Sequence, residues 1–127
     1  CDGRCVINVD QNAKLYIGNK VYFNEDAMIS VKSNVYIGSN CRFGPNVKIF
    51  DNNHCFNKET GVSDMHKSAN IYIGDNCWIA ANAIILKGAH IGENSVIGAG
   101  CIIKGNIPKS SIVTMQSKLK ITPIEDR

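Results

Sequence analysis

The sequence predicts an all-β protein, a parallel β-helix built from hexapeptide repeats. Three observations predict it: a large apolar residue recurs every six positions, Asn or Gly recurs three places later, and a small residue follows. Written in sixes, the chain reads IGSNCR, FGPNVK and IFDNNH from residue 37, and IGDNCW, IAANAI, ILKGAH, IGENSV, IGAGCI and IKGNIP from residue 73. Neither an α-helix (period 3.6) nor a simple strand (period 2) repeats strictly in sixes. A short strand followed by a corner does repeat in sixes, and three such strand-and-corner units close one coil of about eighteen residues.

Each place in the hexad has a physical role. All nine hexads begin with Ile or Phe, which we expect to point inward and fill the core. All nine have Asn or Gly at the fourth place, where a corner requires a left-handed backbone that these residues tolerate. Seven have a residue no larger than Val at the fifth place, and the exceptions are Asn53 and Ile107. Coils built this way should stack as parallel strands about 4.8 Å apart.

Three similar segments set the register between coils: AKLYIG at 13–18, SNVYIG at 33–38 and ANIYIG at 69–74. The first two are 20 residues apart, which is one coil and a two-residue bulge. The last two are 36 apart, which is one coil and an extra segment, 55–72. We therefore expect this segment to leave the stack as an external loop directly after His54. Four isoleucines should then stack on one face: Ile17, Ile37, Ile73 and Ile91.

The predicted organisation is one domain, residues 1–127. Coils should cover about 9–54 and 73–108, and residues 109–127 should cap the last coil with a final strand or short helix. Length, 44% hydrophobic residues and 20% charged residues all suit one ordinary domain. No apolar run approaches the ~20 residues of a membrane span, so no transmembrane segment is expected. The start, CDGRCVINVD, lacks Met and is typical of neither a signal nor a transit peptide.

Charge and cysteine content exclude some functions. The net charge of +3 is scattered, and the densest basic stretch, SKLKI, has two lysines, which argues against a nucleic-acid partner. Six cysteines are compatible with disulfides, although no CxxC pair or compact Cys/His cluster indicates structural zinc. Cys41, Cys77 and Cys101 occupy the small fifth place, so we expect buried thiols. Free thiols favour a reducing compartment, and we expect a cytoplasmic protein.

The hexad IFDNNH at 49–54 carries polar residues that a structural hexad does not need. It keeps the inward isoleucine and Asn52 as the turn residue, and it brings Asp51, Asn53 and His54 together before the loop. Histidine is the side chain best matched to proton transfer near neutral pH. Long loops in compact folds are usually functional or disordered. We predict that His54 is a catalytic base, oriented by Asp51 or by a backbone carbonyl, with Asn53 shaping the corner.

The segment IGDNCWIAANAIILKGAHIGENSVIGAGCIIKGNIP resembles the C-terminal coils of hexapeptide-repeat acetyltransferases. It is most similar to galactoside and maltose O-acetyltransferases and to related enzymes of polysaccharide biosynthesis, over about residues 13–113. The resemblance implies left-handed coils, a homotrimer, and acetyl-CoA bound in a groove between two β-helices. It also implies a catalytic histidine at the place of His54 and no requirement for a metal.

The resemblance implies further site residues. Trp78 matches the family tryptophan after IGDN, beside the pantetheine arm or the acceptor. Ala81 and Ala99 match small residues whose backbone faces the pantetheine chain, and Lys104 lies toward the adenosine end. Asn24, in VYFN, falls where some sugar acetyltransferases hold the acceptor.

The chain departs from the family pattern in two places. IAAN replaces the usual IGAN or IGSN, and VTMQSKLKI replaces the AGNPA that many relatives have after the last hexads. Lys118 or Lys120 is then the candidate to bind the 3′-phosphate of CoA.

The predicted function is acetyl transfer from acetyl-CoA to a hydroxyl of a sugar or polysaccharide precursor. Neutral His54 would accept the hydroxyl proton, the oxygen would attack the thioester directly, and backbone N–H groups at a corner would hold the oxyanion. The alternative acceptor is the amino group of an amino sugar or nucleotide sugar. The sequence does not identify the acceptor.

Three other interpretations remain open. Cys55 beside His54 could be a nucleophile, as in Cys–His catalysis. A zinc site like that of the γ-class carbonic anhydrases needs three converging histidines, and the three here, His54, His66 and His90, lie at unlike places. Of these, His66 lies in the loop and His90 matches a surface corner. A non-catalytic β-helix for binding or assembly is the third interpretation, which failure to bind acetyl-CoA would favour.

Overall fold

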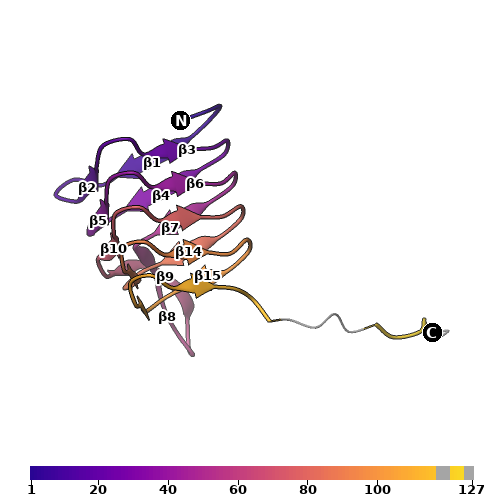
Figure 1. The fold of residues 1–127 in the computed structure, drawn as a ribbon. Coiled ribbons are helices and arrows are strands. Elements are labelled where there is room, and N and C mark those ends of the chain that lie inside the picture. The colour runs from indigo at the N-terminus through magenta and orange to yellow at the C-terminus, as the bar shows by residue number, and fades with distance from the viewer. Residues whose placement is uncertain (117–120, 125–127) are drawn as a thin grey trace.

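The computed structural model describes residues 1–116 and 121–124, and within them every regular element is a β-strand. Fifteen strands form three parallel sheets of five, and the chain crosses each sheet once per coil (Figure 1). Face A contains β1 (Val6–Val9), β4 (Met28–Val31), β7 (Lys48–Phe50), β12 (Ile84–Leu86) and β15 (Ile102–Ile103). Face B contains β2 (Lys14–Ile17), β5 (Asn34–Ile37), β10 (Ile71–Ile73), β13 (His90–Ile91) and β16 (Asn106–Ile107). Face C contains β3 (Tyr22–Phe23), β6 (Arg42–Phe43), β11 (Trp78–Ile79), β14 (Val96–Ile97) and β17 (Ile112–Val113). The predicted parallel β-helix is confirmed, with five coils.

The core is a set of stacked columns, one for each face. The predicted isoleucine column on face B is confirmed, because Ile17 pairs with Ile37, Ile37 with Ile73 and Ile73 with Ile91. On face C, the rings of Phe23 and Phe43 stack with centroids 4.6 Å apart. Identical places in successive coils therefore fill the same column, which is why the sequence repeats.

Left-handed corners confirm the role of the fourth hexad place. Residues with positive φ at that place are Asn40, Asn46, Asn76, Asn82, Gly88, Asn94 and Gly100. Side chains in neighbouring corners bond to each other, as where Asn46 Nδ2 donates to Asn82 Oδ1 at 3.1 Å. The prediction is wrong for Asn52 and Asn106, which both begin strands. At Asn52 the chain leaves the coil before that corner is made.

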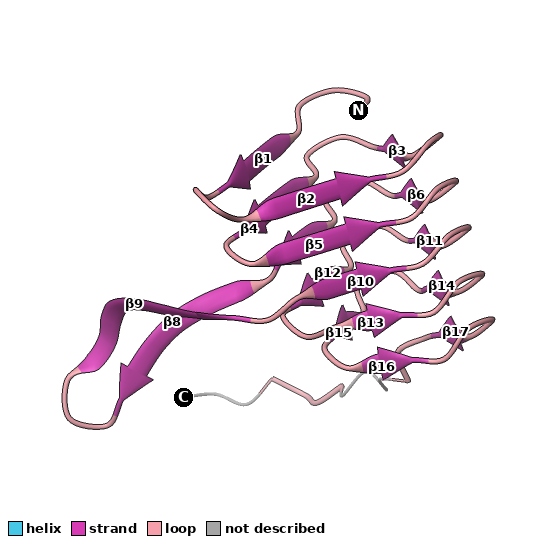
Figure 2. Ribbon diagram, turned by 90° about the vertical axis from the view of Figure 1, so that its left-hand side faces the viewer, coloured by secondary structure: helices cyan, strands magenta, loops and turns pink. Residues whose placement is uncertain are grey.

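The external segment is an antiparallel hairpin that projects from the stack at the corner between faces A and B (Figure 2). It consists of β8 (Asn52–Asn57) and β9 (Gly61–Ser68), with an irregularity in the pairing between His54 and Phe56. The predicted loop, 55–72, thus begins three residues and ends four residues later than the hairpin, which spans 52–68. Asn52 already pairs with Ser68, while Ile71 is buried and pairs with Val35 on face B. The chain re-enters the stack earlier than predicted because the apolar Ile71 side chain fills the core.

The chain ends also differ from the prediction. The first coil begins at Val6 rather than near residue 9, and its strand pairs with β4. In the segment predicted to cap the last coil, β17 is the last strand of the fifth coil and pairs with β14 on face C. The described residues contain no helix that is long and apolar enough to cross a bilayer.

The cysteines divide into two groups. Cys41, Cys77 and Cys101 are buried and free, as their place in the hexad predicts. Hydrogen bonding with Cys77, together with burial, raises the pKa of the Cys41 thiol. Cys1 and Cys5, ahead of the first coil, form a disulfide.

Candidate active site at the base of the hairpin

His54 lies on β8 with its side chain exposed, and one ring nitrogen is held by the opposite strand. Its Nδ1 lies 3.2 Å from the carbonyl oxygen of Ser63. A carbonyl oxygen can only accept, so Nδ1 carries the hydrogen in this bond and Nε2 of the neutral ring is left as an acceptor. The ring of His66, the cross-strand partner, lies with its centroid 4.4 Å away. His54 therefore presents one ring nitrogen that can take up a proton.

Asp51 does not orient this imidazole. Its carboxylate is fully buried and accepts hydrogen bonds from the backbone N–H groups of Lys32 (2.8 Å) and Ser33 (2.7 Å) and from Asn52 Nδ2 (3.0 Å). The backbone N–H of Ala69 donates to the Asp51 carbonyl oxygen at 3.0 Å. Asp51 thus fastens both ends of the hairpin to the preceding coil. Of the two predicted ways to orient His54, the structure contains the backbone carbonyl.

A cavity of about 210 Å³ lies between the base of the hairpin and the later coils. Asn52, Asn53, Leu86, Lys87 and Lys104 line it. The structure thus brings Asn53 and Lys104, both predicted site residues, to one cavity. Lys87 was not predicted. The eighteen-residue period was the available signal, because it places Leu86 next to residue 104 and so brings Lys87 to the same corner.

The predicted donor residues lie at a different edge of the prism. Trp78 faces outward on face C, with 55% of its surface exposed, and Ala81 and Ala99 occupy the corner between faces C and A. Asn24 occupies that corner in the first coil. His54 instead follows β7, where face A ends. One chain therefore places its histidine and its predicted donor residues at opposite edges of face A.

The competing chemistries receive less support from the described residues. Cys55 is partly buried at the irregularity between β8 and β9, and adjacent strand residues point to opposite sides of a hairpin. No cluster of three or more His, Cys, Asp or Glu side chains that could hold a metal occurs in the described part of the chain. Lys118 and Lys120 lie outside the described residues.

Comparisons with known proteins agree with this architecture. Residues 70–105 match the family described as bacterial transferase hexapeptide (six repeats). The chain is 31% identical over 98 residues to the galactoside O-acetyltransferase of Lactococcus lactis, which covers 77% of this chain and 47% of that protein. The chain is a hexapeptide-repeat protein related to the O-acetyltransferases. Its coils are those of a left-handed β-helix.

Two solved acetyltransferase structures are also similar to this hexapeptide-repeat protein. A galactoside acetyltransferase in complex with coenzyme A superposes with a TM-score of 0.70 at 31% identity, covering 85% of this chain and 58% of that one. A maltose O-acetyltransferase from Clostridium difficile 630 gives the same TM-score and identity, covering 87% and 62%. The chain spans about half the length of the curated relatives it matches.

Proposed function

We propose that this hexapeptide-repeat protein is an acetyl-CoA-dependent O-acetyltransferase that acts on a hydroxyl of a sugar or polysaccharide precursor. One observation carries the proposal: His54 is held through Nδ1 by the Ser63 carbonyl, and its Nε2 is left to accept a proton. Relatives named as galactoside O-acetyltransferases support the choice of acceptor, and a galactoside acetyltransferase solved with coenzyme A supports the choice of donor.

In the proposed reaction, His54 is the general base. Nε2 accepts the proton of the acceptor hydroxyl while the hydroxyl oxygen attacks the thioester carbonyl of acetyl-CoA. The Ser63 carbonyl stabilises the imidazolium through the Nδ1 hydrogen bond. Backbone N–H groups at a coil corner hold the developing oxyanion. His54 then returns the proton to the departing CoA thiolate, so the reaction needs neither a protein thiol nor a metal.

The proposed site is shared between two chains of a homotrimer. His54, Asn53 and Lys104 lie at one edge of face A, and the predicted donor residues lie at the other. A head-to-tail interface that closes on itself would bring the first edge of each chain to the second edge of the next. The outward row on face A is mostly apolar, which suits such an interface: Val6, Met28, Lys48, Ile84 and Ile102.

The coils give the proposed site an order along the prism axis. His54 leaves the third coil, whose last strand carries Trp78, while Ala81 and Ala99 follow at the next two corners and Lys104 lies in the fifth coil. Coils rise by about 4.8 Å each. An extended pantetheine arm would run from the level of His54 toward Lys104, where Lys87 offers a second cation to the phosphates. The acceptor would enter from the other side, near Asn24 in the first coil.

The test is a panel of neutral sugars, amino sugars and nucleotide sugars with acetyl-CoA, followed by release of free thiol. Mass spectrometry and hydroxylamine lability then distinguish an ester from an amide product. An ester supports the proposal, and an amide supports N-acetylation of an amino sugar. Failure to bind acetyl-CoA at all would favour a non-catalytic assembly module. The proposal includes a cytoplasmic location, which the three buried free thiols favour and the Cys1–Cys5 disulfide does not.

A further inference from the structure

Face C carries an exposed row of large side chains. The row is apolar or aromatic except at one charged residue. The first residue of each strand on this face points outward, and pairing aligns the five in a column: Tyr22, Arg42, Trp78, Val96 and Ile112. Exposure reaches 39% at Tyr22, 55% at Trp78 and 77% at Ile112. Contiguous exposed apolar surface commonly marks a binding site. Arg42 is the single charge in this column.

The charge of Arg42 is not neutralised within the described part of the chain. The two ion pairs there join Arg4 to Asp26 and Lys32 to Asp10. A nearby carboxylate is committed elsewhere, because the Tyr22 hydroxyl donates to Asp2 Oδ2 at 2.9 Å. This hydrogen bond raises the pKa of Tyr22. An exposed guanidinium between two aromatic side chains is thus available to a ligand.

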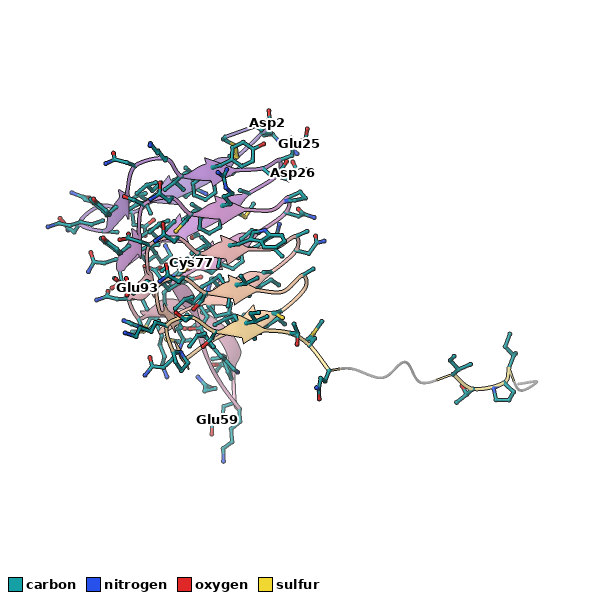
Figure 3. The ribbon with its side chains drawn as sticks, in the orientation of Figure 1. Asp2, Glu25, Asp26, Glu59, Cys77 and Glu93 are labelled. Carbon is teal, nitrogen blue, oxygen red and sulfur yellow. A yellow bond between two sulfur atoms is a disulfide. The ribbon has the colours of Figure 1, made fainter. Side chains whose placement is uncertain are left out.

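The position of Arg42 connects it to the proposed acceptor site. Its strand pairs with that of Trp78 on one side and that of Tyr22 on the other, each about 4.8 Å away. Asn24, the proposed acceptor residue, follows Tyr22 by two residues at the edge of the same face. Acidic side chains gather at the N-terminal end of the prism, where Asp2, Glu25 and Asp26 lie (Figure 3). Asp26 is paired with Arg4, but Asp2 and Glu25 form no ion pair in the described residues and would disfavour an anion in the first coil. An anionic group would therefore lie at the level of Arg42.

We propose that Arg42 binds an anionic group on the acceptor, and that the acceptor is therefore an acidic saccharide. This inference rests on the proposed acetyl transfer. The planar guanidinium matches a carboxylate or a phosphate with two parallel hydrogen bonds. The flanking rings of Tyr22 and Trp78 provide apolar surfaces for the sugar. Arg42 is a specificity-determining residue in this scheme, and proton transfer remains with His54.

The experiment compares three acceptors that differ in one group: galactose, galacturonic acid and galactose 1-phosphate. We expect wild-type kcat/KM to be higher for one or both acidic sugars than for galactose. Arg42→Gln should lower it about ten- to hundred-fold for the acidic sugar, mainly through KM, since hydrogen bonds to charged groups are strong. Galactose should be unaffected. Arg42→Lys should restore part of the loss, and Lys14→Gln, an exposed cation on face B, is the matched control.

The outcomes separate this inference from the proposed function. If the wild type acetylates galactose as well as the acidic sugars, or if Arg42→Gln changes all three equally, the inference is overturned and acetyl transfer stands. If the wild type acetylates none of them nor any other sugar, both fail together. The two acidic arms also decide between a carboxylate and a phosphate as the anionic group. Melting temperatures measured in parallel exclude a folding defect.

Discussion

His54 and His66 face each other across the β8–β9 hairpin with ring centroids 4.4 Å apart, and a backbone carbonyl holds Nδ1 of His54. The two rings share one environment, so they form an internal comparison. We expect His54→Ala to lower kcat/KM about 10²- to 10⁴-fold, the usual cost of losing general-base catalysis. This corresponds to roughly 3–5.5 kcal/mol of barrier. His66→Ala should cost much less, because it removes a neighbouring ring and leaves the Ser63 contact. Steady-state rates with acetyl-CoA and the best acceptor test this.

Three other variants serve as controls for His54. His90→Ala removes a histidine that stacks on Tyr72 on face B and does not line the cavity at the hairpin base, so it should leave the rate unchanged. Asn53→Ala should lose less than His54→Ala because Asn53 only shapes the site. Cys55→Ala should lose little, since direct transfer needs no thiol. Near-normal activity of His54→Ala, or an inactive Cys55→Ala, would mean that the base or nucleophile lies elsewhere.

A second prediction follows from the separation of the two edges of face A. His54→Ala damages one edge, and Ala81→Trp should block the other by filling the proposed donor groove. Each variant alone should be inactive. When the two are unfolded and refolded together in equal amounts, sites that combine the two intact edges should form. In a cyclic assembly with random mixing, about a quarter of the sites would be of this kind.

The size of the assembly provides the control for that experiment. Sedimentation of the wild type should give about three times the chain mass of 13.9 kDa. Restored activity in the mixture together with a trimeric mass supports the shared site. A monomer at micromolar concentration, or a mixture as inactive as its two components, would contradict the shared site.

Trp78 allows a third prediction because it is the only tryptophan in the chain. Its indole is 55% exposed on face C, next to the corner that leads to Ala81. Acetyl-CoA bound along this corner would change the surroundings of the ring. We expect a saturable change in tryptophan emission with the same Kd that calorimetry gives. Binding heat without any change in emission would place the donor away from face C.

The period of six predicted the coils because each hexad forms one strand and one corner. Residues at the same hexad place stack in one column of the core, so each place has the same requirement in every coil. The hairpin boundary was harder, since IFDNNH satisfies the period although its last three residues have left the coil. Ile71 carried the missing information, because an apolar residue that pairs with Val35 must already be inside the stack. The distribution of the site over two edges could not come from motifs alone. Assigning the site residues to the two edges required knowing which of them precede a strand of face A and which follow one.

The role of Asp51 differs most from the sequence prediction, and it provides a fourth prediction. Its buried carboxylate accepts the backbone N–H groups of Lys32 and Ser33, so Asp51→Ala leaves two backbone donors without a partner. Each unsatisfied buried group costs about 1–3 kcal/mol, so the loss of both acceptors should lower the free energy of unfolding by roughly 2–6 kcal/mol. The stability of Asp51→Asn should lie between that of the wild type and that of Asp51→Ala. The amide supplies one acceptor oxygen but turns its NH₂ group toward the other donor.

Urea unfolding of Asp51→Ala, Asp51→Asn and the wild type measures these differences, with Asp64→Ala as the control at an exposed place on the same hairpin. A structural anchor should lower the urea midpoint in the order wild type, Asn, Ala. An aspartate that instead oriented His54 directly would behave differently: the midpoint would stay constant while kcat fell. Because the Asp51 backbone carbonyl also accepts the Ala69 N–H, weakening this junction should loosen the hairpin base before it loosens the coils. Backbone amide hydrogen exchange should therefore become faster first in β8 and β9. If exchange became faster to the same extent in the strands of faces A, B and C, the anchoring role would be contradicted.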